Sequence, residues 1–236
     1  MRAAIIVAGG SGDRLGREGG KQLAHVWGRP LLYHTLAVFD ACPTIDAIVV
    51  VVHPERIGEY RREAIDVVGS PKVMAVVPGG ETRQQSVAAG LAALPGSAAI
   101  VVVHDGARPL VSPDVITDAV RVLEGDATLA GVVVGHPSFD TLKIVDEDGD
   151  VVGTVDRSLF WAAQTPQVFR VEVLRRAYER ARVDGFLGTD DASLVERCQG
   201  TVRMLAGPRR NIKVTVAEDL AIVEALLGGG GEESDE

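Results

Sequence analysis

Residues 3–14 read AAIIVAGGSGDR, and this stretch decides the fold. Its first part, Ala3–Val7, is an apolar run typical of a buried strand, and it ends in a glycine-rich turn. Because glycine has no Cβ, such a turn lets an anion approach backbone N–H groups closely. Arg14 and Lys21 follow in the turn and its exit, where they can neutralise charge on a polyphosphate whose P–O bond breaks. The stretch therefore predicts a strand that leads into a nucleoside triphosphate site.

Two better-known glycine-rich motifs do not match this turn. A dinucleotide fingerprint needs a third glycine at the position of Leu15, and Gly16 comes one residue late. A P-loop needs serine or threonine after its lysine, but Lys21 is followed by Gln22. The turn alone leaves a phosphate site and an ordinary tight turn both open. An NAD-binding oxidoreductase stays a remote alternative.

Composition favours one globular α/β domain over residues 1–227. The chain has 236 residues, of which 46% are hydrophobic, and no apolar run approaches the ~20 residues that cross a bilayer. We therefore expect a soluble protein with no membrane partner. The two cysteines are too few for a disulfide framework, which favours the cytoplasm.

Charge argues against a nucleic-acid partner and marks a tail. The formal net charge is −9, whereas nucleic-acid surfaces are normally basic. Residues 228–236 read GGGGEESDE and contain nothing to bury, so we expect a disordered acidic tail.

Apolar β-branched runs alternate with helical patterns along the chain, which is typical of a mostly parallel sheet covered by helices on both faces. Strands are expected at Ala3–Val7, Ala47–Val52, Val73–Val77, Ile100–Val103, Gly131–Val134 and Val202–Leu205. Helix starts are indicated by Pro30, Pro54, Ser112-Pro113 and the capping-box patterns Thr82–Gln85 and Thr215–Glu218.

Residues 137–154 interrupt this alternation with a predicted β-hairpin. Two strand-like runs, Thr141–Val145 and Val151–Thr154, flank a turn signal at Asp146–Gly149. A two-stranded ribbon is not stable by itself in water, so it must lie on another surface. A second copy of the protein is one candidate, and the hairpin's own domain is the other.

Two further motifs follow predicted strands. Asp105 and Arg108 come directly after Ile100–Val103, so we expect them at the carboxyl edge of the sheet, where open α/β folds bind ligands. Asp105 can hold Mg²⁺ or sugar hydroxyls there, or the two residues can form an ion pair that braces the loop. Gly79–Arg83 leads into a helix, where backbone N–H groups meet the positive end of the helix dipole. Its alternative is an ordinary capped turn.

Taken together, these motifs resemble the 2-C-methyl-D-erythritol 4-phosphate cytidylyltransferases of the non-mevalonate isoprenoid pathway. The resemblance runs from Ala8 to about Leu220 and depends on the order of several motifs. They are the glycine-rich start with Arg14 and Lys21-Gln22, Gly79-Gly80-Glu81 with Arg83 and Ser86, Asp105–Pro109, Asp140–Lys143, Thr154–Arg157, Gln164–Gln167, Thr189–Ala192 and Asn211–Thr215. The resemblance implies a Rossmann-like, mostly parallel sheet with a protruding β-hairpin arm for dimerisation.

The resemblance also implies a role for each matching residue. Those that bind the CTP phosphates, cytosine and ribose are Ala8, Gly9, Gly10, Gly80, Glu81 and Ser86. Those that stabilise the transition state or position the acceptor phosphate are Arg14, Lys21, Arg157 and Lys213. Those with further acceptor contacts are Asp105, Arg108, Thr141 and Thr165. Because Arg157 follows the arm, it is expected to complete the site of the partner subunit in a homodimer.

The expected chemistry needs cations and no catalytic nucleophile. A phosphate monoester has its second pKa at about 6, so it is already an anionic nucleophile at neutral pH. The protein must hold two anions together for in-line attack, with Mg²⁺ or another divalent cation bound mainly through the CTP phosphates. A cytidylyltransferase for another polyol phosphate, such as ribitol 5-phosphate, stays the closest alternative because the two differ only at the acceptor end.

Overall fold

The computed structural model describes residues 1–10 and 20–228. Arg14 therefore lies outside the described residues, as does the expected acidic tail apart from Gly228, the last residue of α8. In the described part of the chain, no helix has the length and apolar character needed to cross a bilayer.

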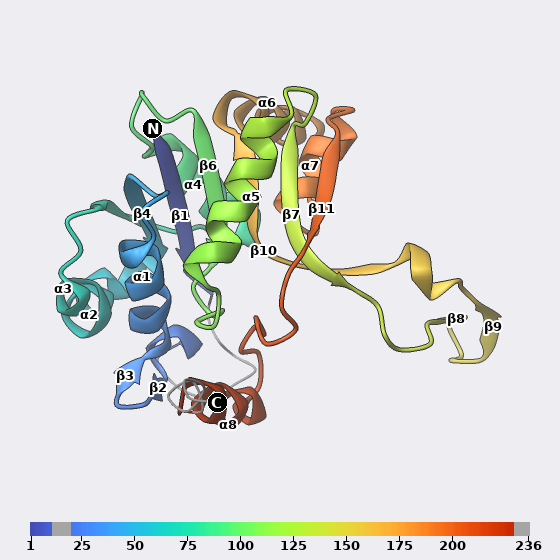
Figure 1. Ribbon diagram of the computed structural model, residues 1–236, viewed down its shortest axis with the longest axis horizontal. Coiled ribbons are helices and arrows are strands. Elements are labelled where there is room, and N and C mark those ends of the chain that lie inside the picture. Colours follow the sequence, from blue (N-terminus) through green and yellow to red (C-terminus); the bar gives the residue numbers. More distant parts are fainter. Residues whose placement is uncertain (11–19, 229–236) are drawn as a thin grey trace, which may run out of the picture.

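A seven-stranded sheet forms the centre of the molecule (Figure 1). Its strand order is β11-β7-β10-β6-β1-β4-β5. The strands are β1 (Arg2–Ala8), β4 (Ala47–Val52), β5 (Val73–Pro78), β6 (Ile100–Asp105), β7 (Gly131–Pro137), β10 (Trp161–Arg170) and β11 (Val202–Ala206). All neighbouring pairs are parallel except those of β10, which is antiparallel to both β6 and β7.

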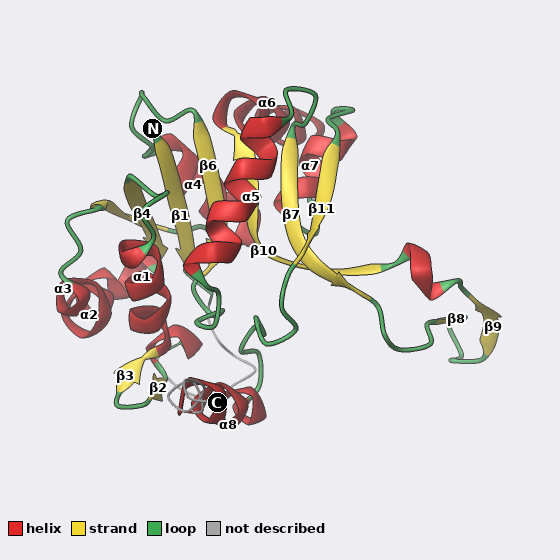
Figure 2. Cartoon of the chain, viewed as in Figure 1, coloured by secondary structure: helices red, strands yellow, loops and turns green. Residues whose placement is uncertain are grey.

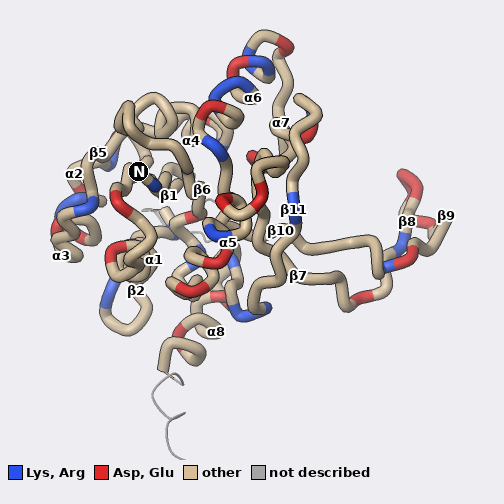
Figure 3. The backbone as a smooth tube through the Cα atoms, turned by 45° about the horizontal axis from the view of Figure 1, so that its top comes forward, with Lys and Arg blue, Asp and Glu red and all other residues tan. Residues whose placement is uncertain are grey.

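Helices cover both faces of this sheet, as predicted. In β1, Ala4 and Ile6 face one core cluster while Ala3 and Ile5 face another, which is the two-residue period of a strand buried on both sides. The first cluster is covered by α1 (Leu31–Ala41) and α5 (Pro113–Gly125), and the second by α4 (Arg83–Ala92), α6 (Val171–Asp184) and α7 (Asp191–Arg197). Figure 3 shows bases and acids side by side along α6, where Arg182 pairs with Glu179.

Shorter helices complete the fold. They are the 3₁₀ helices η2 (Lys21–Leu23), η3 (Pro54–Arg56) and η5 (Arg157–Leu159), the π-helical turn η4 (Arg61–Ile65), and the short α2 (Ile57–Tyr60) and α3 (Asp66–Val68). The last helix, α8 (Ala217–Gly228), lies over the small hairpin formed by β2 (His25–Val26) and β3 (Arg29–Pro30). Val26, Val214 and Val223 form a third apolar cluster there.

The predicted helix starts are close to the observed ones. Ser112 caps α5 with Pro113 at the first helical position, and Thr82 and Gln85 form a reciprocal capping box at α4. Pro30 precedes α1 instead of opening it. At α8 the capping box expected between Thr215 and Glu218 is shifted, because the carboxylate of Asp219 accepts the N–H groups of Thr215 and Val216.

The predicted hairpin forms an arm that leaves the body of the molecule (Figures 1 and 2). It consists of β8 (Lys143–Val145) and β9 (Val151–Thr154), paired antiparallel. Val151 and Val152 are 60% and 62% exposed, so the arm does not fold back on its own domain. The alternative in which it does so is therefore wrong, and its role in dimerisation stays a prediction.

Candidate active site

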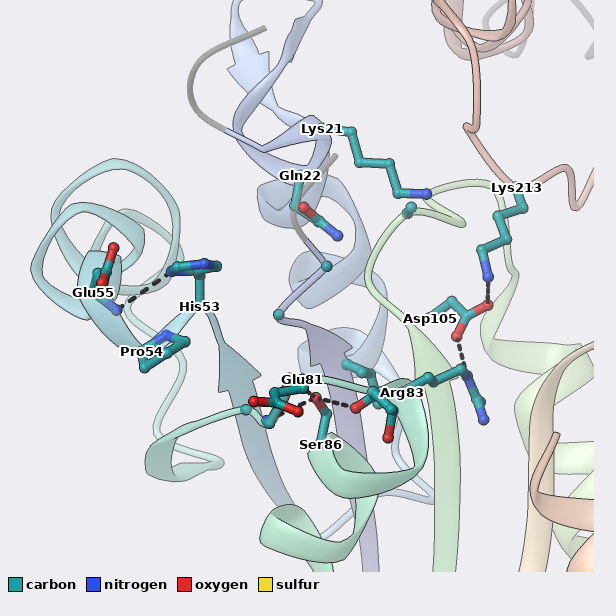
Figure 4. A pocket seen from close by; sticks show the side chains of 17 residues that line it. Lys21, Gln22, His53, Pro54, Glu55, Glu81, Arg83, Ser86, Asp105 and Lys213 are labelled. Carbon is teal, nitrogen blue, oxygen red and sulfur yellow. Dashed lines mark hydrogen bonds and ion pairs between the residues drawn. The ribbon is translucent and has the colours of Figure 1, made fainter. Parts of the chain in front are cut away.

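A pocket of about 620 Å³ opens where β1, β4, β5 and β6 end. These four strands run parallel, so their carboxyl ends meet at one edge of the sheet, which is where open α/β folds place ligands. The volume lies within the range of small-molecule sites. Figure 4 shows the side chains that line the pocket, which come from the ends of these strands and from the Lys21 and Lys213 segments.

One wall of the pocket is made of glycine backbone. Gly9 and Gly10 follow β1, and Gly79 and Gly80 follow β5. A Cβ on Gly79 would lie 2.7 Å from the Ser86 hydroxyl oxygen, so the close packing of this wall requires a residue without a side chain. The Ser86 hydroxyl in turn accepts the Gly80 N–H at 3.2 Å and donates to the Thr82 carbonyl at 3.0 Å. The sequence thus builds a rigid loop at the start of α4.

The opposite wall carries charge. The Asp105 carboxylate at the end of β6 accepts hydrogen bonds from Arg83 Nε at 3.1 Å and is paired with Lys213 Nζ at 2.7 Å. Arg83 also donates through Nη2 to Asp191 at 2.8 Å, and the Asp191 side chain is fully buried. Arg108 Nε lies 3.9 Å from Asp105 and completes the cluster. Three cations against two carboxylates leave excess positive charge beside the pocket.

These contacts fix the ionisation of Asp105. Burial alone would raise the pKa of this carboxyl group, but the charges of Arg83, Lys213 and Arg108 outweigh that effect and hold its pKa well below its usual range. Burial alone would lower the pKa of the Arg83 guanidinium group, but the carboxylates of Asp191 and Asp105 outweigh that effect and raise this pKa. Both residues are therefore charged at neutral pH.

Lys21 also lines the pocket. Figure 4 shows the side chains of Lys21 and Lys213 both extending into the space beside Asp105. Lys21 opens η2 and is preceded by Gly20, whose φ of +71° is a conformation that glycine adopts readily. Lys21, which the sequence predicts to neutralise charge on a polyphosphate, thus lines the same pocket as the glycine wall and the charged wall.

The structure brings together most of the predicted site residues. Those that line the pocket are Gly9, Gly10, Lys21, Gly80, Glu81, Ser86, Asp105 and Lys213. Ala8 is the buried last residue of β1 beside them. Thr165 and Arg108 lie behind the charged wall, where the Thr165 hydroxyl accepts the Asp105 N–H at 3.1 Å and Arg108 donates to the Asn211 carbonyl at 2.7 Å.

Two predicted residues lie away from this pocket. Thr141 and Arg157 belong to the arm region, and Arg157 donates to the Phe139 carbonyl at 2.6 Å. Neither lines the pocket of its own chain. Whether they reach the pocket of a second chain depends on the homodimer, which stays a prediction.

Comparison with known proteins decides the family. The family model of the 2-C-methyl-D-erythritol 4-phosphate cytidylyltransferases matches residues 2–229. The chain is 42% identical over 228 residues to the enzyme of that name from Geobacter metallireducens, covering 95% of this chain and 96% of the relative. This chain belongs to the 2-C-methyl-D-erythritol 4-phosphate cytidylyltransferase family.

Other relatives agree with this assignment. A bifunctional IspD/IspF enzyme from Desulforudis audaxviator is 46% identical over 227 residues, and the chain spans 96% of its own length but 57% of that relative. The crystal structure of 4-diphosphocytidyl-2C-methyl-D-erythritol synthase from Anaerococcus prevotii superposes with a TM-score of 0.83 at 30% identity, covering 97% of this chain and 98% of that one. The predicted family and α/β fold are confirmed, and the NAD-binding alternative is not favoured.

The charged wall fits a metal ion that is bound by the phosphates of a ligand better than a metal ion that is bound by protein side chains. Both Asp105 oxygens are engaged by cations, so a metal ion would have to displace Lys213 to reach the carboxylate. Across residues 1–10 and 20–228, no group of three His, Cys, Asp or Glu side chains is placed to hold a metal ion. A metal contact at Asp105 stays a prediction that this geometry disfavours.

Sequence reasoning gave no role to Arg83 and Asp191, although both lie in motifs that carry the family resemblance. Arg83 lines the pocket and joins the two buried carboxylates, while Asp191 lies behind it. A signal was present, because Arg83 stands at the first position of a capped helix and Asp191 belongs to the polar run Thr189–Ala192. Only the fold shows that these segments, 108 residues apart, meet.

Proposed function

We propose that this chain transfers CMP from CTP to 2-C-methyl-D-erythritol 4-phosphate and releases pyrophosphate. An oxygen of the acceptor phosphate attacks the α-phosphorus of CTP, and the bond from that phosphorus to the bridging oxygen of the β-phosphate breaks. The observation that carries the proposal is the pocket itself, in which a glycine wall and Lys21 face the charged wall of Arg83, Asp105 and Lys213.

The glycine wall would take the nucleotide. Gly9 and Gly10 offer backbone to the phosphates, and the loop from Gly80 to Ser86 holds the nucleoside. Thr82 and Gln85 close this loop through their capping box, so its backbone groups need little reorganisation when CTP binds. Lys21 lies where it can stabilise charge on the triphosphate.

The charged wall would take the acceptor. In the free protein Lys213 is neutralised by Asp105, at 2.7 Å. An incoming phosphate competes for the same ammonium group, and the excess positive charge of the cluster favours that exchange. The Asp105 oxygen that Lys213 leaves can then accept a hydrogen bond from a hydroxyl group of the polyol. Because the phosphate is already anionic, no side chain has to remove a proton from it.

Mg²⁺ is the cofactor that we propose, bound through the CTP phosphates. It supplies neutralisation of charge on the triphosphate and the leaving pyrophosphate. Lys21 and Lys213 provide the complementary charge from the protein side, since both line the pocket. We further propose that the enzyme works in the cytoplasm.

We also propose a homodimer in which each arm reaches the partner. The exposed apolar residues of β9 provide a surface to bury, and Arg157 at the base of the arm would add a cation beside the partner's acceptor phosphate. This arrangement explains why Arg157 lies far from the pocket of its own chain.

The direct test is to incubate the protein with Mg²⁺, CTP and one polyol phosphate at a time, and to follow pyrophosphate. We expect release with 2-C-methyl-D-erythritol 4-phosphate. Release with ribitol 5-phosphate alone would assign the closest rival activity. Omitting Mg²⁺ in the presence of a chelator tests the cofactor, and undiminished turnover under that condition would exclude it.

Mixing two inactive variants tests the shared site. Lys21→Ala removes a cation supplied by the chain's own pocket, and Arg157→Ala removes one supplied to the partner. If arms are exchanged, mixed dimers contain one pocket with both defects and one with neither, so activity returns on mixing. Demonstrated subunit exchange without any recovery would exclude the exchanged arm.

A further inference from the structure

Behind the pocket, a continuous chain of polar contacts runs from α6 to Lys213. The Tyr178 hydroxyl of α6 donates to Oδ1 of Asp191, and Oδ2 of the same carboxylate accepts from Arg83 Nη2 at 2.8 Å. Arg83 Nε donates to Oδ1 of Asp105 at 3.1 Å, whose Oδ2 pairs with Lys213 Nζ at 2.7 Å. Four segments of the chain are thereby connected through one guanidinium group.

The two ends of this chain differ in exposure. Tyr178 is 8% exposed and the Asp191 side chain is fully buried, whereas Lys213 is 35% exposed and lines the pocket. A buried carboxylate is stable only if its oxygens are paired. Arg83 and Tyr178 each pair with one oxygen of Asp191, so the buried end holds Arg83 from behind.

The Arg83 guanidinium group needs this contact with Asp191 to keep a fixed orientation at the pocket. Arg83 donates to two carboxylates in two directions, and a lysine at the same position has no fixed fork with which to do so. If Asp191 loosened, Arg83 would be free to turn toward Asp105 alone or toward a bound phosphate. Asp105 and Lys213 would then lose the fixed point that sets their positions.

We propose that Asp191 and Tyr178 are positioning residues for the acceptor end of the site and act through Arg83. Neither side chain lines the CTP and acceptor pocket. Together they hold the Arg83 guanidinium group in place, and this group in turn positions the Asp105 carboxylate. When the acceptor phosphate binds, the Lys213 ammonium group exchanges its contact with Asp105 for one with that phosphate. The inference rests on the proposed function for the identity of that acceptor. The glycine wall is also held by its own capping box, so we expect CTP binding to depend less on this chain of contacts than acceptor binding does.

The test is a double-mutant cycle that joins Tyr178→Phe with Arg83→Lys. We expect Tyr178→Phe alone to lower kcat/KM for the acceptor by about tenfold, with the KM for CTP changed less than about twofold. In the Arg83→Lys background, Tyr178→Phe should change kcat/KM for the acceptor by less than about twofold. The reason is that the guanidinium group through which Tyr178 acts has already been replaced. Tyr33→Phe on α1 is the control, since the structure shows its ring near Arg29 and His34 and away from this network.

Asp191→Asn provides a second variant if Tyr178→Phe does not fold, and it should show the same acceptor-specific loss. Each protein is assayed well below its unfolding temperature. Equal losses from Tyr178→Phe in both backgrounds would overturn the proposal, because a structural role is independent of Arg83. A parallel rise in the KM of CTP would overturn it as well.

Binding separates this inference from the proposed function. The acceptor is titrated by calorimetry into protein loaded with the nonreactive α,β-methylene analogue of CTP. In the separate assay with CTP, absence of turnover by the wild-type protein with this acceptor would mean that the proposed function fails. The positioning role of Tyr178 is contradicted separately if the Tyr178→Phe variant and the wild-type protein bind the acceptor with equal affinity and turn it over at equal rates.

Discussion

His104 and Asp105 are neighbours in β6 and show how position sets the charge of a residue. Asp105 faces three cations and stays ionised, whereas His104 is fully buried against Phe39, with ring centroids 5.0 Å apart. His104 Nε2 donates to the Arg108 carbonyl at 3.1 Å, and its Nδ1 has no hydrogen-bond partner among the residues that the structure describes. Burial lowers the pKa of His104 to about 4; the hydrogen bond to the Arg108 carbonyl and the charge of Asp105 oppose this shift, whereas the charges of Arg108 and Arg83 add to it.

This imidazole predicts a pH dependence of stability. An unfolded histidine titrates near 6.5, so between about pH 6.5 and 4 the unfolded chain binds a proton that the folded chain does not. The free energy of unfolding should therefore fall as the pH drops through this window, by about 3 kcal/mol from His104 alone.

Urea unfolding of His104→Gln across this pH range checks the prediction. The variant should be less stable than wild type near pH 8, because the buried site is refilled imperfectly, but its stability should fall less on acidification. His25→Gln on an exposed residue is the control and should follow wild type. Parallel pH curves for His104→Gln and wild type would show that the imidazole contributes nothing.

Among the structural elements, the start of α4 is the part that sequence predicted best. The Thr82 cap, the glycines before it and Ser86 all form the expected loop, because capping depends on residues a few positions apart. Contacts between distant segments were beyond such reasoning. Arg83 meets Asp191 only because α4 and α7 cover the same face of the sheet.

Strand β10 was missed for a related reason. Its middle contains Gln164, Thr165, Pro166 and Gln167, a polar run with proline that does not match the pattern of a central strand. The structure nevertheless places it between β6 and β7. The buried amides have partners in distant segments, since Gln167 donates to Asp190 and Gln164 accepts from Asn211. The register shifts between Ala163 and Gln167. Tertiary contacts thus override the local sequence signal.

The α4 loop yields a prediction about nucleotide binding. A Cβ at residue 80 would lie 2.5 Å from Gln85 Cβ, so Gly80→Ala must displace a member of the capping box. We expect the KM for CTP to rise by about tenfold and stability to fall by about 1 kcal/mol. Steady-state kinetics and thermal unfolding measure the two effects.

Gly58→Ala is the matched control, because no atom of the described part of the chain lies within 4 Å of a Cβ at that position in α2. It should leave the KM for CTP unchanged and stabilise the fold slightly. An equal KM for Gly80→Ala and wild type would remove the loop from the nucleotide site.

On the scale of the whole molecule, the arm is the feature that a single chain does not explain. Its apolar residues are exposed, and it carries a predicted site residue away from the pocket. Within residues 1–10 and 20–228, its strands pair with each other alone. Exposed apolar residues of this kind contribute to stability only when another surface covers them and removes them from water.

Charge introduced on both faces of β9 should therefore dissociate the proposed dimer. Val151→Lys together with Val152→Lys places ammonium groups on residues that are 60% and 62% exposed in the single chain, so folding of the body should be unaffected. Sedimentation velocity should show dimers for wild type and monomers for this variant, with loss of activity. Val183→Lys on α6, which is 66% exposed, should remain dimeric. An unchanged sedimentation coefficient for the arm variant would contradict the proposed interface.

The position of β10 also constrains the order in which the sheet is assembled on the ribosome. Strands β1, β4, β5 and β6 come from the first 105 residues and are adjacent in the sheet, so they can pair as they emerge. Strand β7 is synthesised next but has no neighbour until residues 161–170 arrive, because its partners are β10 and the later β11. The nascent chain must therefore carry an unpaired apolar strand, followed by the whole arm, until β10 joins the two parts of the sheet.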